Sequence, residues 1–367
     1  MHHSRSTAIV ELEPLGHRLR YVRLLLLGLS PTQRLLLVPP SVAASPEFVE
    51  HLGDLDAAVV PLSSDDHDTA IPEAVALATR HGAGHFVVPE GDKAVRPLLR
   101  TLLRGTLGRS RPRRPAITLL LMRTAMPGGS EAATVGMALK PGLVAALRRL
   151  PAVRVLFLTD AFGVVTRRRG FPGVEPVRDP VVPPAELPAT PRSGRARVGA
   201  FGVISARKNV PVLVRAAASR DDVDVVLAGR CEPDVREFLA DDPDAARLRA
   251  AGRLHVDDRL LDEAEFDAAL RSVDVAAVLH DNDAPSGIVA EACARGVPVL
   301  GPDRGWIATV LDVTGCGVGA SVGNPTDVAN ALTQLLGDHE RYVVSARKAA
   351  GALGADDFVG GLLGDRA

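Results

Sequence analysis

Short apolar runs alternate with longer segments of helical periodicity along most of this chain. Runs such as Arg34–Val38, Ala116–Met122 and Val153–Thr159 are rich in apolar residues rather than regularly alternating with polar ones. Strands of this kind are buried on both faces, as they are in parallel sheets that helices cover on both sides. Because strands that alternate with helices build such sheets, we predict an α/β protein with doubly wound parallel sheets.

A proline-rich segment divides the chain into two parts. Apolar runs are few between about Pro180 and Arg197, and prolines crowd there at positions 180, 183, 184, 188 and 191. Such a segment is typical of an interdomain linker, and 367 residues are enough for two domains of ordinary size. We predict a first domain of residues 1–183, a linker of 184–197, a second domain of 198–340 and a C-terminal segment of 341–367.

Composition limits the class of protein. The net charge is -1 and only 3% of the residues are aromatic, so the chain has neither a global basic field nor many stacking platforms for nucleic acid. None of Cys231, Cys293 and Cys316 forms a C-x-x-C pair, and their odd number argues against a disulfide framework. Met1–Ser4 lacks the features of a secretion signal. We therefore expect no nucleic-acid partner and a cytoplasmic location.

The leucine run Leu24–Leu27 has two interpretations. It is too short to span a bilayer. With Arg18, Arg20 and Arg23 just before it, the segment could contact a membrane surface, or it could be an amphipathic helix that packs on a sheet. Both alternatives stay open at this point.

The segment from Asp283 to Pro298 carries the strongest functional signal. Ser286-Gly287 precedes a predicted helix of Ile288–Arg295, Gly296 ends it, and a buried strand follows. Asp283 and Glu291 are eight positions apart, slightly over two helical turns, so both can face one cleft. A glycine at a helix start leaves backbone N–H groups that point at an anion. Acids around an anion-binding helix start fit a nucleotide-sugar site.

This segment resembles the signature of retaining GT-B glycosyltransferases, and of glycosyltransferase family 4 in particular. That signature has Glu, seven residues and Glu, then Ala, a small residue, Gly and Pro-Val, which Glu291–Val299 match. Asp283 stands where the first acid is usually Glu. Further matches follow in family order at Phe201-Gly202, Arg207-Lys208-Asn209, Leu227-Ala228-Gly229 and Asn324–Asp327. The resemblance covers roughly 198–336, and the N-terminal half matches only as a general α/β domain.

The resemblance implies a GT-B architecture, in which two Rossmann-like domains face a cleft. The C-terminal domain then holds the nucleotide-sugar donor, the N-terminal domain holds the acceptor, and a last helix, here Asp356–Leu363, crosses back to the first domain. It implies closure of the domains over the donor and front-face displacement with retention. The implied enzyme is a metal-independent glycosyltransferase of the hexosyl type that needs no cofactor besides its donor and uses an unknown acceptor hydroxyl.

Residue roles follow from the same resemblance. Lys208 takes the place of the lysine that holds the diphosphate, and Arg207 is the candidate substitute for an arginine whose position is occupied by Val203. Glu291 is expected to accept hydrogen bonds from the ribose hydroxyls, and Asp283 to contact the donor sugar. The remaining candidates for donor binding are Gly202, Ser286, Gly287, Ile288 and the first loop, Gly16-His17, where relatives often have Gly-Gly.

Some weaker candidates and alternatives remain. His280 could contact phosphate or acceptor, and Asp160, at the end of a strand, could contact the acceptor. The triplet Asp281–Asp283 is similar to the D-x-D of metal-dependent GT-A enzymes, although its place in the pattern argues against a metal. No G-x-G-x-x-G follows a first strand and no P-loop sequence occurs. A catalytically degenerate GT-B protein that serves as a binding partner, and a GT-B epimerase, are the alternative functions.

Overall fold

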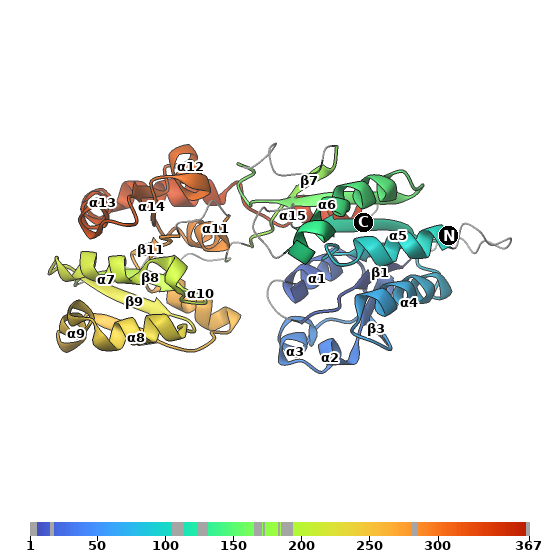
Figure 1. Ribbon diagram of the computed structural model, residues 1–367, viewed down its shortest axis with the longest axis horizontal. Coiled ribbons are helices and arrows are strands. Elements are labelled where there is room, and N and C mark those ends of the chain that lie inside the picture. Colours follow the sequence, from blue (N-terminus) through green and yellow to red (C-terminus); the bar gives the residue numbers. More distant parts are fainter. Residues whose placement is uncertain are drawn as a thin grey trace. The chain divides into compact units, whose positions relative to one another are not determined.

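The computed structural model of the chain (Figure 1) describes residues 6–14, 18–104, 114–122, 131–164, 171, 173–182, 184, 194–280 and 285–364. For 131–139 it describes the backbone only. The chain forms two compact units. Unit 1 consists of Met1–Thr159, Val165–Pro180 and Ala355–Ala367, and unit 2 of Asp160–Val164 and Val181–Gly354.

Unit 1 contains a seven-stranded parallel sheet in the order β3-β2-β1-β4-β5-β6-β7. Its strands are β1 (Thr7–Val10), β2 (Arg34–Val38), β3 (Ala58–Pro61), β4 (His85–Val88), β5 (Ala116–Leu121), β6 (Val153–Thr159) and β7 (Glu175–Arg178). Its helices are α1 (Arg18–Leu27), α2 (Pro40–Ala43), α3 (Pro46–Leu52), α4 (His67–Arg80), α5 (Val95–Arg104), α6 (Glu131–Arg148) and α15 (Asp356–Leu363), with a 3-10 turn at Pro31–Gln33.

Unit 2 contains a six-stranded parallel sheet in the order β10-β9-β8-β11-β12-β13. Its strands are β8 (Ala196–Phe201), β9 (Val223–Ala228), β10 (Leu254–Asp257), β11 (Val275–Ala277), β12 (Val299–Pro302) and β13 (Gly317–Ala320). Its helices are α7 (Val210–Ala218), α8 (Pro233–Asp241), α9 (Pro243–Ala250), α10 (Glu263–Arg271), α11 (Gly287–Ala294), α12 (Gly305–Thr314), α13 (Pro325–Gly337) and α14 (His339–Ala350), with a 3-10 turn, η2, at Ala206–Lys208. Two parallel sheets covered by helices confirm the predicted α/β class.

Burial on both faces explains the apolar strands of unit 1. Side chains alternate between the two faces of a strand. In β1, Ala8 and Val10 belong to the hydrophobic cluster on one face of the sheet, and Ile9 belongs to the cluster on the other. β2 behaves in the same way, so neither strand leaves a polar face for solvent. The apolar runs therefore reflect a sheet that helices cover on both sides.

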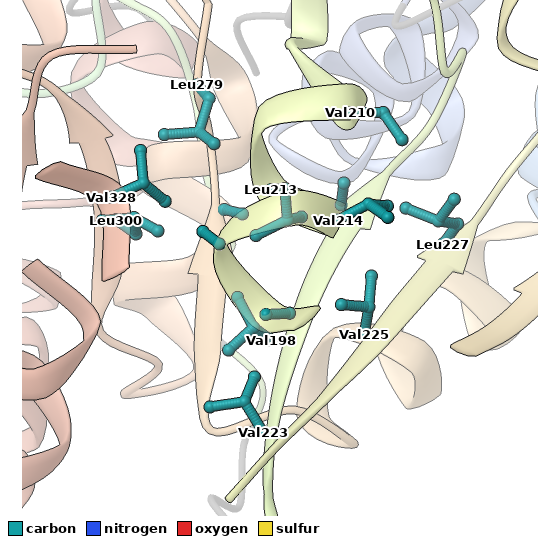
Figure 2. Close-up of a cluster of buried hydrophobic side chains, with 14 of the residues drawn as sticks. Val198, Val210, Leu213, Val214, Val223, Val225, Leu227, Leu279, Leu300 and Val328 are labelled. Carbon is teal, nitrogen blue, oxygen red and sulfur yellow. The ribbon is translucent and has the colours of Figure 1, made fainter. Parts of the chain in front are cut away.

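A large hydrophobic core of unit 2 lies between its sheet and several helices, among them α7 and α13, and Figure 2 shows part of it. Leu213 and Val214 of α7 point toward the sheet residues Val198 and Val225, and all four side chains are fully or almost fully buried. Burying side chains of this size stabilises the fold by about 1.5–3 kcal/mol each. This packing holds β8 and the start of α7 rigidly, and the loop between them is part of the candidate site.

The last helix, α15, belongs to unit 1 although α14, just before it, belongs to unit 2. Phe358 of α15 is fully buried and packs against the ring of Tyr21, with 4.8 Å between the ring centroids. The guanidinium of Arg154 donates to the carbonyl of Gly361 over 2.7 Å. In Figure 1 the red α15 therefore lies among the blue and green elements of unit 1.

Helix α1 contains the leucine run and packs inside unit 1. Leu25 and Leu26 are fully buried, whereas Leu27 is 51% exposed. Leu19 and Val22 are also buried, in the same cluster as Ile9 of β1. The run thus packs on the sheet through one side of the helix. No helix in the described parts of the chain is long and apolar enough to cross a bilayer.

Several elements differ from the sequence predictions. The first strand of unit 2, β8, ends at Phe201, because Gly202 has a φ of 77° and leaves the extended conformation. The edge strands β7 and β13 and the helices α2, α3, α9, α12 and α14 were not predicted. In β7 only Val177 is buried, so its sequence lacks the apolar run that marks the central strands.

Candidate functional site

The candidate site lies at the carboxyl ends of the central strands of unit 2. The chain runs from β8 to β9 and β10 on one side, and then returns to β11 on the other side of β8. In open parallel sheets, ligands bind at this switch point, beyond the carboxyl ends of the two diverging strands. Here the segments at the switch point are Gly202–Asn209, after β8, and Leu279-His280, after β11.

Two glycines shape the loops after β8 and β9. Gly202 has a φ of 77° and donates its N–H to the carbonyl of Ala228 over 3.0 Å. Gly229 has a φ of 140°, and a Cβ atom at this position would overlap the backbone carbonyl of Gly202. Only glycine allows both the conformation and the close approach. The backbone therefore turns sharply at the switch point and leads into the segment that carries the cations.

Lys208 is held at the end of β8. It closes η2, and its ammonium donates to the carbonyl of Phe201, the last residue of β8. Burial, and then the nearby guanidinium of Arg207, lower the pKa of Lys208 to about 8. Arg207 itself is exposed. The site thus contains one partly desolvated cation and a second one in solvent beside it.

Asn209 connects this segment to β11. Its φ of 51° places it in the left-handed region, which asparagine tolerates better than most residues. Its side-chain amide donates to the carbonyl of Leu279 over 2.6 Å. This bond joins the residue after Lys208 to the residue before His280, so the two segments of the switch point form one rigid unit.

His280 lies in this cationic environment. Its side chain is 8% exposed, and burial, followed by the charges of Lys208 and Arg207, lowers the pKa of the imidazole to about 4. In the segment after β8, the buried hydroxyl of Ser205 has no hydrogen-bond partner among the described residues. The site therefore combines a neutral imidazole with two cations, which is an arrangement that an anion would stabilise.

Helix α11 begins at the same edge of the sheet, because it follows β11 in the chain. Ser286 is its N-cap residue but makes no side-chain cap bond, and its carbonyl accepts from Val289 over 3.1 Å. At the start of the first turn, Gly287 is exposed and Ile288 is half-buried. N–H groups in the first turn of a helix have no acceptor within the helix, so this end of α11 can bind an anion.

Glu291 belongs to a chain of ion pairs behind the helix start. One of its carboxylate oxygens accepts from the guanidinium of Arg295 over 2.6 Å, and Arg295 also donates to Asp267 over 2.7 Å. Only 12% of the Glu291 side chain and 8% of the Arg295 side chain are exposed. Arg295 therefore restricts the rotamer of Glu291. A carboxylate oxygen can accept more than one hydrogen bond, so this pair is compatible with a further ligand.

The structure brings together part of the predicted site. Gly202, Arg207, Lys208 and His280 meet at the switch point, and Ser286, Gly287, Ile288 and Glu291 lie on the first two turns of α11. Gly16, His17 and Asp283, together with the rest of the Asp281–Asp283 triplet, lie outside the described residues. Asp160 is 5% exposed and accepts from the backbone N–H groups of Phe162 and Val164, so it stabilises its own turn.

Sequence reasoning missed two residues of this site, Asn209 and Arg295. Both left a signal in the sequence. Asparagine after a basic pair is a residue type that adopts the left-handed conformation. Arg295 is four positions after Glu291, which is the spacing of a helical ion pair. Arg295 also forms an ion pair with Asp267 on another helix. The positions of these residues in the sequence do not predict that second ion pair.

Unit 1 has its own switch point, between β1 and β4. Glu11 directly follows β1 and is 3% exposed. One of its oxygens accepts from the N–H groups of Leu12 and Glu13 over 2.9 and 3.0 Å, and the other is buried without a partner in the described part of the chain. Burial raises the pKa of Glu11 to about 7. Arg18, at the start of α1, pairs with Glu13 and with Glu90, which follows β4.

Glu11→Gln is expected to remove a pH dependence of the stability of unit 1. The folded-state pKa of Glu11 lies above its ordinary value, so the folded state keeps this proton longer than the unfolded state does. Native stability therefore falls as the pH rises from about 4.5 to 7, by roughly 3 kcal/mol. The variant lacks this loss. Urea denaturation followed by circular dichroism at pH 5 and pH 8 measures it.

The control for this experiment is Glu50→Gln, on an exposed position of α3. The free energy of unfolding of the Glu11 variant, relative to that of the native protein, should be larger at pH 8 than at pH 5 by about 2–3 kcal/mol, because only the native protein loses stability over this range. The control should show no such difference. Equal pH dependence of the native protein and both variants would show that Glu11 does not titrate in this range.

Comparison with known proteins shows what this fold is similar to. No family model matches the chain. A GDP-mannose-dependent alpha-mannosyltransferase of Mycolicibacterium smegmatis is 30% identical over 156 residues, which are 42% of this chain and only 38% of the length of that enzyme.

Similar solved structures cover almost the whole chain. Anabaena HepE, solved with UDP and glucose, has a TM-score of 0.66 at 13% identity and covers 98% of both chains. A glycosyltransferase of Rickettsia africae has a TM-score of 0.69 at 12% identity, covering 99% of this chain and 100% of that one. Sucrose-phosphate synthase of Thermosynechococcus elongatus has a TM-score of 0.63 at 16% identity, covering 98% and 97%. The chain therefore has the GT-B fold of these glycosyltransferases.

Proposed function

We propose that this protein is a glycosyltransferase that transfers a hexosyl group from a nucleotide-diphospho-sugar to an acceptor hydroxyl. The observation that carries this proposal is the partly desolvated ammonium of Lys208, held at the switch point of unit 2 by the carbonyl of Phe201. The names of the similar proteins support it. HepE was solved with UDP and with UDP-glucose, and the mannosyltransferase depends on GDP-mannose.

Lys208 and Arg207 supply the charge that the reaction needs. When the bond between sugar and diphosphate breaks, negative charge grows on the leaving diphosphate, and cations already in place stabilise it. Lys208 acts in a less polar environment than bulk water, which strengthens its interaction with an anion. An arriving diphosphate also favours the protonated form of the lysine. The N–H groups at the start of α11 offer further donors to the donor anion.

Glu291 is the proposed ribose ligand. Its carboxylate can accept from both vicinal hydroxyls of a ribose, and the ion pair with Arg295 fixes its orientation before the donor arrives. Because Arg295 also pairs with Asp267 of α10, the orientation of Glu291 is set by two helices. Arg295 is thus a positioning residue for the donor site.

We place the reaction in the retaining, metal-independent class, with front-face displacement in which the departing phosphate helps to remove the proton from the acceptor. This assignment follows from the likeness of Glu291–Val299 to the family 4 signature. We expect the anomeric configuration of the product to equal that of the donor. An NMR time course of the anomeric proton measures it, and an inverted product would remove the protein from this class.

Glu291→Gln tests the donor site. The amide keeps the size and one acceptor oxygen but replaces the other acceptor with a donor, so one ribose contact becomes a mismatch. Loss of a charge-assisted hydrogen bond weakens binding by roughly 1.5–3 kcal/mol, or about ten- to a hundredfold. Calorimetric titration with a panel of UDP-, GDP- and ADP-linked sugars measures the affinity and also identifies the base.

The control compares two donors, with and without the ribose 2′-hydroxyl, and two variants, Glu291→Gln and one at an exposed position. The native protein should discriminate against the 2′-deoxy donor, and Glu291→Gln should do so much less. Glu237→Gln, at an exposed position of α8, should behave like the native protein. If the native protein and Glu291→Gln show the same ratio of affinities for the two donors, Glu291 does not bind the ribose. If no sugar nucleotide of the panel binds to the native protein, the proposed function is wrong.

A further inference from the structure

His280 lies at the switch point of unit 2, directly after the segment that follows β11. The ring of His280 makes no hydrogen bond and no ion pair with any residue that the structure describes, although its side chain is only 8% exposed. The carbonyl of the preceding Leu279 is held by Asn209, so the position of His280 is fixed relative to η2. Its ring nitrogens are not among the fully buried unpaired polar atoms of the described residues, so the ring can still be reached from solvent and is available to a ligand.

The charges that act on His280 point to an anion. The described charged groups that influence its ring are Lys208 and Arg207, both cationic and both from η2. Strand β11, which precedes His280, carries no charged side chain. Burial, and then the charges of Lys208 and Arg207, lower the pKa of the imidazole to about 4, so the ring is neutral at ordinary pH before a ligand binds. An anion bound beside Lys208 removes this repulsion and favours imidazolium.

We propose that His280 is a third ligand of the donor diphosphate, which it binds as imidazolium, so that binding of the donor is coupled to uptake of a proton. This inference rests on the proposed function, because it takes the diphosphate of the donor as the anion beside Lys208. The ring nitrogen that gains the proton donates a charge-assisted hydrogen bond to a phosphate oxygen. The proton comes from solvent, and it returns there when the nucleoside diphosphate leaves.

This arrangement has a consequence for the balance of charge. Without a bound anion, a third fixed cation would be disfavoured by burial and would repel Lys208 and Arg207. A histidine supplies the third charge only while the anion is present, since its ordinary pKa lies near neutrality. The site is therefore able to bind a doubly charged diphosphate without a permanent cluster of three cations.

Calorimetry at pH 6.5 tests the proposal. Titrations with UDP-glucose and GDP-mannose are carried out in several buffers of different ionisation enthalpy, and the slope of the observed enthalpy against that of the buffer counts the protons taken up. Both phosphates of a sugar nucleotide are fully ionised diesters at this pH, and Lys208 is already protonated because its pKa is about 8. Uptake therefore reports on His280. We expect about 0.5–1 proton per donor.

Two variants complete the test. His280→Gln keeps a hydrogen-bond donor but cannot take up a proton, so its uptake should fall to about zero, and its affinity at pH 6.5 should fall about tenfold or more. His255→Gln, on the half-exposed edge strand β10, should keep the proton uptake of the native protein. The chemical shift of the His280 ring in NMR spectra, with and without donor, gives the protonation state directly.

The outcomes separate this inference from the proposed function. Donor binding that depends on Lys208 but takes up no proton, or the same uptake in His280→Gln as in the native protein, overturns the role of His280 and leaves the glycosyltransferase proposal in place. Absence of binding to any sugar nucleotide overturns both. Uptake that His280→Gln abolishes and His255→Gln keeps supports the inference.

Discussion

Replacing Lys208 with alanine is expected to weaken the binding of a nucleoside diphosphate by about ten- to a hundredfold. The ammonium lies at the switch point of unit 2, and a lost charge-assisted contact to phosphate corresponds to roughly 1.5–3 kcal/mol. Binding of the nucleoside without phosphates should change little. Calorimetric titrations of both ligands into the native protein and the variant measure the difference.

Two further results are expected from the same titrations. Because the pKa of Lys208 is about 8, the lysine loses its charge as the pH rises above that value, and diphosphate binding to the native protein should weaken there. Binding to Lys208→Ala should lack this step. Lys348→Ala, at an exposed position of α14, is the matched control and should bind like the native protein. Equal losses for nucleoside and nucleoside diphosphate would exclude Lys208 from the phosphate site.

Replacing Gly229 with alanine is expected to destabilise unit 2 by roughly 2–5 kcal/mol, since it combines backbone strain with a steric overlap. Its φ of 140° is unfavourable for any residue with a Cβ atom, and that atom would overlap the carbonyl of Gly202. To relieve the overlap, the loop after β8 must move, and this loop carries Lys208. Urea denaturation followed by the fluorescence of Trp306, the single tryptophan, reports on unit 2.

Gly252→Ala separates the two causes. Gly252 also has a positive φ, of 67°, but a Cβ atom there would meet nothing within 4 Å. This control should lose only about 1–2 kcal/mol, the strain of the backbone alone. Its donor affinity should equal that of the native protein, whereas Gly229→Ala should also bind the donor less tightly. Equal destabilisation by the two variants would show that the overlap with Gly202 adds nothing to the loss in free energy of unfolding.

The central strands were predictable because a strand that is buried on both faces consists mainly of apolar residues. Val153–Thr159 was predicted with the bounds that β6 has, since apolar residues fill the strand and Asp160 ends it. The helix around Glu291 was predicted within one residue of α11, because Ser286-Gly287 and Gly296 mark its two ends. β7 was missed because an edge strand with one buried residue has no apolar run.

The sequence also predicted which residue types form the site, but it did not predict their hydrogen-bond partners or their burial. Lys208 and Glu291 could be named from their spacing and from the resemblance. That Lys208 donates to Phe201 and that Glu291 pairs with Arg295 depends on how β8, η2 and α11 fold locally. Glu11 gave no functional signal in the sequence, and its pKa is raised only because unit 1 closes around it.

By itself, the sequence determined the α/β class, the central strands and the residue types that can bind a nucleotide sugar, because periodicity, glycine positions and spacing are local properties of the chain. Only the tertiary structure decided which strands are neighbours, and hence where the switch points lie. His280 illustrates the difference. It is distant in sequence from Lys208, and only the pairing of β11 with β8 and the bond from Asn209 to Leu279 bring its ring under the influence of that cation. Burial and electrostatic interaction depend on distance in space, which the order of residues does not contain.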